Sequence, residues 1–167
     1  MSFVNVGIPV SIIETTAEFL EKGMNIIKNN YAATVSKGRL TQESMDKRIN
    51  LLTPTIDWEV IKDADIIIEA VFEEMSIKKE IFTKIDNLAK ENAILASNPS
   101  TLDIDEIADA TNRPEEVVGT HFFSPANVMR LLEIVRGSRT KNDILATLMS
   151  LAKKIKKVGI IAGNCDG

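Results

Sequence analysis

The residues best suited to chemistry are His121, the only histidine in 167 residues, and Glu133, which follows it within a second apolar run. An apolar, β-branched pair at 117–118 leads up to the histidine. This predicts an imidazole at or just past the end of a buried strand. A carboxylate inside the apolar run at 131–135 needs a partner, and a nearby imidazole would serve, because the pair orients the ring and favours its protonated form. The residues alone leave an equal alternative, in which a core histidine has its hydrogen bonds satisfied and the glutamate faces solvent.

This segment resembles the catalytic segment of the 3-hydroxyacyl-CoA dehydrogenases. The resemblance rests on H-F-F-S-P at 121–125, V-M at 128–129 and Glu133. In that family the histidine is the general acid/base at the hydroxyl carbon, and a glutamate twelve residues later pairs with it. The resemblance implies these catalytic roles for His121 and Glu133, and it favours them over the structural alternative.

A second stretch resembles part of the same family's cofactor site. E-A-V-F-E-E at 69–74, followed by Lys78, matches a motif in which the first glutamate of the final pair and the lysine lie against the cofactor. The resemblance implies that Ala70, Glu73 and Lys78 bind the cofactor. For the lysine, a charge on a solvated helix face is the alternative.

A third stretch, S-N-P-S at 97–100, resembles the family's S-N-T-S. There the second serine hydrogen-bonds both substrate and cofactor, which implies a catalytic and cofactor-binding role for Ser100. The resemblance also implies that Asn98 and Ser124 lie near the cofactor. Pro99 departs from the family pattern, and it removes a backbone N–H and restricts Asn98 to extended conformations.

Glu14 closes a short apolar strand predicted at 10–13. An acidic residue at the end of the second strand of a dinucleotide-binding fold hydrogen-bonds the adenosine ribose hydroxyls. Its charge would repel a 2′-phosphate, so the predicted cofactor is NAD. A solvated residue in a helix-capping turn is the alternative.

Helices predicted at 16–36 and 41–52 form a hairpin similar to the insertion that this family carries after its second strand. In the family, a polar residue and a lysine of the hairpin contact coenzyme A. By position the resemblance implies Asn30 and Lys37 for these contacts, and hence an acyl-CoA substrate. Solvated surface residues are nearly as good an interpretation of both.

Composition bounds the class of protein: 44% hydrophobic and 26% charged residues are typical of a globular domain. The net charge of −4 argues against a nucleic-acid or membrane-surface partner, and no metal site is expected. The single cysteine, Cys165, suits a reducing compartment. No apolar run approaches the ~18 residues of a membrane span, and the first ten residues do not predict a signal peptide. We therefore expect the cytoplasm for a bacterial protein, and otherwise the interior of a reducing organelle.

The alternation of strands and helices predicts an α/β, Rossmann-like, doubly wound and mostly parallel sheet with the helical hairpin as an insertion. Ser76 is expected to cap the third helix, and Asp103 with Glu106 to form a capping pair for the next. The remaining expected strands are 53–55, 64–71, 94–96, the run before His121, 131–135 and 158–162, and the remaining expected helices are 77–90, one after Asp103, and 143–156.

The sequence contains no G-x-G-x-x-G. The match to the family begins partway through the helix that follows that loop, which implies that the first strand and the phosphate-binding glycines are lacking. In strand order 3-2-1-4-5-6 that strand would lie between those at 10–13 and 65–71. We therefore expect residues 1–167 to be a partial NAD-binding domain, truncated at both ends and without the family's C-terminal helical domain, and closest to multifunctional hydratase/dehydrogenase chains.

Two further expectations follow from the lacking strand. The unpaired edges of the flanking strands would invite pairing with a second copy, so an edge-paired or strand-swapped homodimer is expected. The alternative to an enzyme is a catalytically silent domain with a structural or interaction role.

Overall fold

The computed structural model describes residues 1–98 and 102–164, so Ser100 and Cys165 lie outside the described residues. The chain divides into two compact units, Met1–Val60 and Ile61–Gly167, and each is described by itself.

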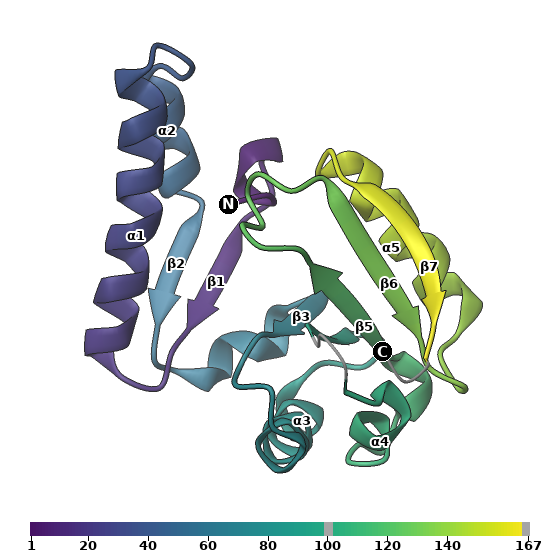
Figure 1. The fold of residues 1–167 in the computed structure, drawn as a ribbon. Coiled ribbons are helices and arrows are strands. Elements are labelled where there is room, and N and C mark those ends of the chain that lie inside the picture. Colours follow the sequence, from purple (N-terminus) through teal and green to yellow (C-terminus); the bar gives the residue numbers. More distant parts are fainter. Residues whose placement is uncertain (99–101, 165–167) are drawn as a thin grey trace. The chain divides into compact units, whose positions relative to one another are not determined.

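The first unit contains a small parallel sheet and a helical hairpin (Figure 1). Strand β1 (Val10–Ile13) pairs with β2 (Leu52–Thr55), and α1 (Ala17–Ser36) and α2 (Gln42–Ile49) connect them. Thr16 and Thr41 cap the two helices with their side-chain oxygens. The buried core consists of Val4, Tyr31 and Leu52.

The predicted hairpin is confirmed, but the second helix was predicted too long. It ends at Ile49, whereas the sequence indicated an end at Leu52. The reason is that Leu52 is buried as the first residue of β2 and pairs with Val10 across the sheet. Pro54 is tolerated because β2 lies at the edge of its sheet.

The second unit is built on a five-stranded sheet in the order β3-β4-β5-β6-β7. Neighbouring strands run parallel except β5 and β6, which are antiparallel. Helices α3 and α4 pack together, and α5 packs on β6 and β7 (Figure 1). The fold is therefore the predicted Rossmann-like, mostly parallel α/β type. Its elements are β3 (Ile66–Glu69), α3 (Met75–Leu88), β4 (Ile94–Ser97), α4 (Ile104–Ala108), a short 3₁₀ helix (Pro114–Glu116), β5 (Val117–Phe122), β6 (Leu131–Arg136), α5 (Asn142–Lys154) and β7 (Val158–Gly163). Two more short 3₁₀ helices lie at Val4–Val6 in the first unit and at Trp58–Asp63, which spans the boundary of the two units.

Strands β1 and β3 belong to separate sheets. The two predicted helix caps in the second unit had different outcomes. Asp103 caps α4 as expected, because its carboxylate accepts from the N–H groups of Asp105 and Glu106. The predicted cap at Ser76 is wrong: α3 begins at Met75, and the Ser76 hydroxyl instead donates to the Glu74 carboxylate at 2.6 Å.

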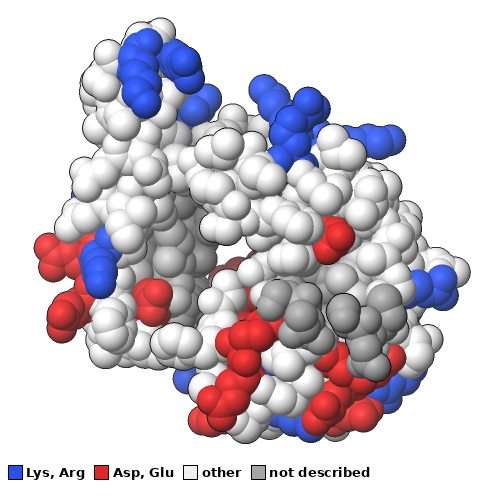
Figure 2. All heavy atoms as spheres, in the orientation of Figure 1, with Lys and Arg blue, Asp and Glu red and all other residues white. Residues whose placement is uncertain are grey.

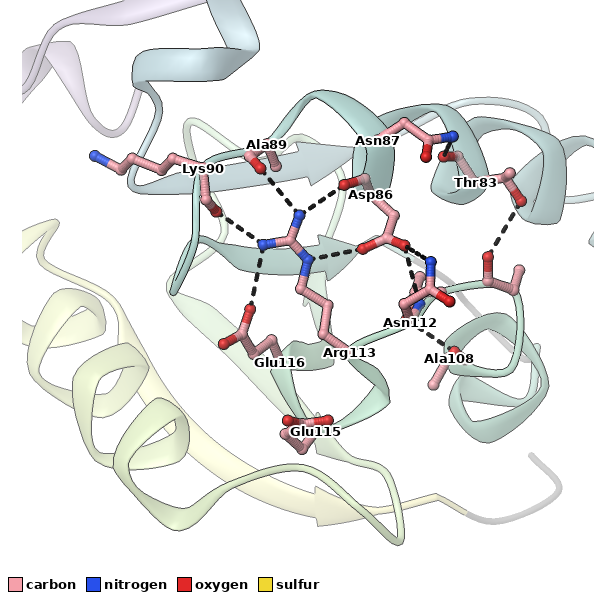
Figure 3. A network of polar contacts seen from close by, with 12 residues as sticks. Thr83, Asp86, Asn87, Ala89, Lys90, Ala108, Asn112, Arg113, Glu115 and Glu116 are labelled. Atoms are coloured by element: carbon pink, nitrogen blue, oxygen red, sulfur yellow. Dashed lines mark hydrogen bonds and ion pairs between the residues drawn. The ribbon is translucent and has the colours of Figure 1, made fainter.

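A cluster of polar contacts ties the end of α3 to the start of β5 (Figure 3). The Arg113 guanidinium donates to the carboxylate of Asp86 at 2.7 Å and to the carbonyl oxygens of Asp86, Ala89 and Lys90 at 2.7–3.0 Å. It also lies 3.6 Å from the buried Glu116 carboxylate. Arg113 thus satisfies carbonyls that the helix end leaves free, at the amino edge of the sheet.

No helix among the described residues is long and apolar enough to cross a membrane.

Candidate active site

The carboxyl ends of β3, β4 and β5 meet at one edge of the sheet, because these three strands are parallel. This edge is where ligands bind in open α/β sheets. It brings together residues 70–74 after β3, Asn98 after β4, and His121 near the end of β5.

His121 and Glu133 face each other directly across β5 and β6. The Nδ1 atom of His121 lies 3.0 Å from Oε2 of Glu133. Because a carboxylate oxygen only accepts, this contact assigns a hydrogen to Nδ1, and in the neutral ring Nε2 then keeps its lone pair for another partner. The two side chains are 22% and 29% exposed, so the pair is accessible from solvent and His121 is not enclosed in the core.

The local sequence explains this pairing. On β6, Leu132 and Ile134 are buried, so strand alternation turns Glu133 to the other face. A direct antiparallel pair places two such side chains within reach of each other. Gly119 permits the close approach of the strands, since a Cβ there would lie 2.7 Å from the Cβ of Val135. The predicted pairing is therefore present, and the catalytic role of the two residues stays a prediction.

Two neighbouring contacts shape the surroundings of His121. The ring of Phe123 lies 4.4 Å from the imidazole, centroid to centroid. Asn98 links β4 to both neighbouring strands, because its side-chain oxygen accepts from the Phe122 N–H of β5 at 2.9 Å and its backbone N–H donates to the Glu69 carbonyl of β3 at 2.8 Å. The predicted place of Asn98 near the cofactor stays a prediction.

The segment after His121 is held by a lysine that the sequence analysis did not single out. The Nζ of Lys157 donates to the carbonyl oxygens of Ala126 and Met129. Burial lowers the pKa of Lys157 below its ordinary value. A basic residue just before a predicted strand gives no sequence signal for such a contact, since its partners are backbone atoms far along the chain.

Lys78 is fully buried, so the alternative interpretation of a charge on a solvated helix face is wrong, and its role at the cofactor stays a prediction. The sequence analysis missed the buried cluster that surrounds it, behind the loop after β3. The Lys78 ammonium, which is fully buried, lies 2.8 and 3.0 Å from the two carboxylate oxygens of Glu69. Ser97 donates to the same carboxylate at 2.7 Å. Lys78 also lies 3.5 Å from a carboxylate oxygen of Glu73. The available signal was Glu69 itself, a charged residue closing a strand that is otherwise apolar.

The other predicted site residues lie at the surface. Ala70, Glu73 and Ser124 are exposed in the second unit, and Asn30 and Lys37 are exposed in the first. Glu14 follows β1 at its carboxyl end and is partly exposed. The prediction for Ser100 lies outside the described residues.

Each unit offers a carboxylate that could accept a hydrogen bond from a ribose hydroxyl. Glu14 follows β1 in the first unit and Glu73 follows β3 in the second, each after the carboxyl end of a parallel strand. No group of three or more His, Cys, Asp or Glu among residues 1–98 and 102–164 could hold a metal ion.

Comparison with known proteins places these features in a family. The family described as "3-hydroxyacyl-CoA dehydrogenase, NAD binding domain" matches residues 1–165. A peroxisomal fatty acid β-oxidation multifunctional protein of Arabidopsis thaliana is 42% identical over 159 residues, which cover 95% of this chain and 22% of the plant protein. A peroxisomal bifunctional enzyme of Cavia porcellus is 41% identical over 169 residues, covering 100% of this chain and 23% of that enzyme. The crystal structure of M. tuberculosis FadB2 superposes with a TM-score of 0.97 at 32% identity, covering 99% of this chain and 59% of FadB2. The chain thus spans less than a quarter of the length of the Arabidopsis thaliana and Cavia porcellus relatives.

Proposed function

Because the chain belongs to the 3-hydroxyacyl-CoA dehydrogenase family, we propose that it carries the catalytic pair of an enzyme of fatty-acid β-oxidation. The reaction is the NAD-dependent oxidation of a 3-hydroxyacyl-CoA to a 3-oxoacyl-CoA. The observation that carries the proposal is the contact of 3.0 Å between His121 and Glu133, at the sheet edge where the cofactor of such a fold binds.

In this mechanism His121 is the general base. Its Nε2 lone pair accepts the proton of the 3-hydroxyl group, while Nδ1–H remains bonded to Glu133. The Glu133 carboxylate holds the ring in the required tautomer and stabilises the imidazolium that forms. When bound, NAD supplies the acceptor for the hydride that leaves the hydroxyl carbon. In the reverse direction the imidazolium returns the proton to the oxygen.

Glu14 and Glu73 would accept hydrogen bonds from the ribose hydroxyls of NAD. Ala70, Asn98, Ser100 and Ser124 complete the proposed cofactor site, and Ser100 would also bind the substrate oxygen. Lys78, which is fully buried, would act on the cofactor through Glu73. The support is the position of the described members at or next to the carboxyl ends of β1, β3, β4 and β5.

The coenzyme A part of the substrate would contact Asn30 and Lys37. Both residues are exposed, and the connection between α1 and α2 carries Lys37 and Arg39. Figure 2 shows Lys and Arg side chains at the end of the first unit where this connection lies in Figure 1. Exposed cations suit the phosphate groups of coenzyme A as point charges.

The test is NADH formation from 3-hydroxybutyryl-CoA by the intact gene product. H121Q should lower kcat by about a hundredfold or more, because the general base is lost, with little change in the affinity for NAD. E91Q, which changes an exposed carboxylate before β4, is the control and should keep full turnover. Unchanged turnover by H121Q would refute the proposed role.

A catalytically silent domain is the competing function, and the lack of a G-x-G-x-x-G in these 167 residues favours it. That loop supplies N–H groups to the pyrophosphate of a dinucleotide. The same assay on the 167-residue chain separates the two functions, since robust turnover would exclude the silent one.

We also propose that the 167-residue chain self-associates, most simply as a dimer whose open strand edges pair or exchange. The support is that β3 ends its sheet and that Ile66, Ile67 and Ile68 are only partly buried. An open apolar edge invites pairing with another strand. Light scattering on dilute protein should give about twice the monomer mass, and a stable monomer of 18.4 kDa would refute dimerisation.

For location, we propose an organelle interior of the peroxisomal type. The support is that the Arabidopsis thaliana and Cavia porcellus relatives are named as peroxisomal proteins. Cell fractionation with peroxisomal and cytosolic markers would decide between this location and the cytoplasm.

A further inference from the structure

Glu69 makes a complete set of hydrogen bonds at the carboxyl end of β3. Its Oε1 atom accepts from the Val71 N–H at 2.6 Å and from Lys78 at 2.8 Å. Its Oε2 atom accepts from Lys78 at 3.0 Å and from the Ser97 hydroxyl at 2.7 Å. Glu69 is 4% exposed, and Lys78 and Ser97 are fully buried. The carboxylate therefore joins three elements, β3, β4 and α3, without contact to solvent.

Stability alone is a poor reason for such a pair. The desolvation of two buried charges offsets much of their attraction, and apolar residues of similar volume often stabilise a protein as well. The position of the pair is informative, because it lies directly behind the loop at 70–74. A second buried ion pair of this unit, Asp86 with Arg113, lies at the opposite, amino edge of the sheet.

Two contacts carry the effect of Glu69 to the surface loop. The Val71 N–H fixes the backbone where the loop leaves β3. Lys78, which Glu69 holds, reaches Glu73 at 3.5 Å, and the Glu73 side chain is 34% exposed whereas Lys78 is 0% exposed. The exposed carboxylate is thus the group within reach of a ligand, and the buried residues set where it stands.

We propose that Glu69 is a positioning residue for the cofactor: it orients the loop at 70–74 and, through Lys78, the Glu73 carboxylate that meets a ribose hydroxyl. This inference rests on the proposed function, because Glu73 is placed there as a cofactor ligand. Lys78 then acts on the cofactor from behind Glu73, as the cation that holds the carboxylate in place.

The variant E69Q tests the inference. A glutamine offers one acceptor oxygen in place of two. Its amide nitrogen then takes the place of one oxygen and faces the Lys78 ammonium together with the Val71 N–H or the Ser97 hydroxyl. We expect the KM for NAD to rise about tenfold with kcat at saturating NAD within a factor of two, because binding and not chemistry is disturbed. In hydrogen exchange, the Val71 amide should lose its protection.

D86N is the control, since it weakens a second, less deeply buried ion pair at the other edge of the same unit. It should lower the unfolding midpoint and leave both the KM for NAD and the Val71 protection unchanged. If E69Q lowers the midpoint as D86N does and changes neither of the other two quantities, Glu69 is merely structural and the inference is wrong.

Two further arms keep the test decisive. If E69Q does not fold, the double variant E69Q/K78M takes its place, because it leaves neither charge of the pair buried and should fold. It should still show the raised KM for NAD, since Glu73 has lost its contact with Lys78. A normal KM would overturn the inference. If the unaltered protein shows no turnover, the proposed function fails. Binding of NADH, measured by its fluorescence, then takes the place of KM. An affinity for NADH that E69Q leaves unchanged would overturn the inference independently of the proposed function.

Discussion

At the scale of single residues, the site depends on which ring nitrogen of His121 carries a hydrogen. The Glu133 carboxylate can only accept, so it fixes the hydrogen on Nδ1 and leaves Nε2 free. A glutamine at position 133 can donate as well as accept, and it would permit both tautomers. Losing this control should weaken catalysis without removing the base.

We therefore expect E133Q to lower kcat about tenfold to a hundredfold, less than H121Q does, with the KM for NAD unchanged. Steady-state kinetics at several NAD concentrations will check both parameters. The double variant H121Q/E133Q should be no slower than H121Q alone, because two residues that act as a unit are not additive. A further loss in the double variant would show that Glu133 acts independently of His121.

The His121–Glu133 pair was predictable through the resemblance of the segment around it to the family's catalytic segment, because the residues alone left an equal alternative in which Glu133 faces solvent. In the structure Glu133 lies between two buried residues on β6, and the antiparallel register places it directly opposite His121 on β5. The Glu69–Lys78 contact could not be foreseen in the same way. It depends on the path of the loop at 70–74, which brings the start of α3 back over the end of β3. No periodicity in the sequence predicts that path.

At the scale of elements, α3 is fixed near both ends by ion pairs. Lys78 in its first turns meets Glu69 of β3, and Asp86 in its last turn meets Arg113 ahead of β5. Burial alone would raise the pKa of Asp86, but hydrogen bonds from Asn112 and Arg113 and the Arg113 charge lower it below 3.8. A depressed pKa in the folded state means that the pair contributes stability above pH 3.8, and that this is lost as the pH falls through the lower, folded value.

D86N should therefore lower the free energy of unfolding by about 2 kcal/mol at pH 7. The difference between the unaltered chain and D86N should stay constant down to about pH 5 and shrink below pH 3.8. Urea unfolding followed by circular dichroism between pH 3 and 7 measures it. D63N, which changes an exposed aspartate, is the control. A difference that persists unchanged at pH 3 would contradict the assigned cause.

The predicted elements were reliable in type and less so at their ends. The helix predicted at 41–52 ends earlier, at Ile49, and Leu52 is the first residue of β2. The reason is that a buried Leu52 stabilises the chain more as a strand partner of Val10 than as the end of a helix. The strand predicted at 64–71 is also shorter, since β3 covers only Ile66–Glu69. Just beyond it, the Val71 N–H donates to the Glu69 side chain instead of to a neighbouring strand, so the loop begins there.

At the scale of the whole molecule, the two units have cores of very different size. The cluster in Met1–Val60 contains three buried residues, Val4, Tyr31 and Leu52. The sheet of the second unit carries many more, among them Leu95 and Ile134. Since stability scales with the apolar surface removed from water, the first unit should unfold at a lower urea concentration than the second.

The chain provides one reporter for each unit, because Tyr31 is its only tyrosine and His121 its only histidine. The ring signals of both residues in proton NMR spectra should disappear in separate urea transitions, with Tyr31 first. Transitions that coincide would show that the units unfold as one.

Alkaline pH should widen the separation. Burial raises the pKa of Tyr31 above 10.0 despite the opposing effect of Arg48, and the hydroxyl donates to Asn5 at 2.7 Å. A raised pKa in the folded state means that this stability is fully present below pH 10.0 and is lost as the pH rises through the folded value. From pH 7 to pH 11 the Tyr31 transition should therefore move to lower urea. Y31F has no proton to lose, so its first unit should be weaker by about 1 kcal/mol at pH 7 and should lack the part of the alkaline shift that Tyr31 causes. If Y31F and the unaltered chain shift equally, the phenol is not the group that destabilises the first unit.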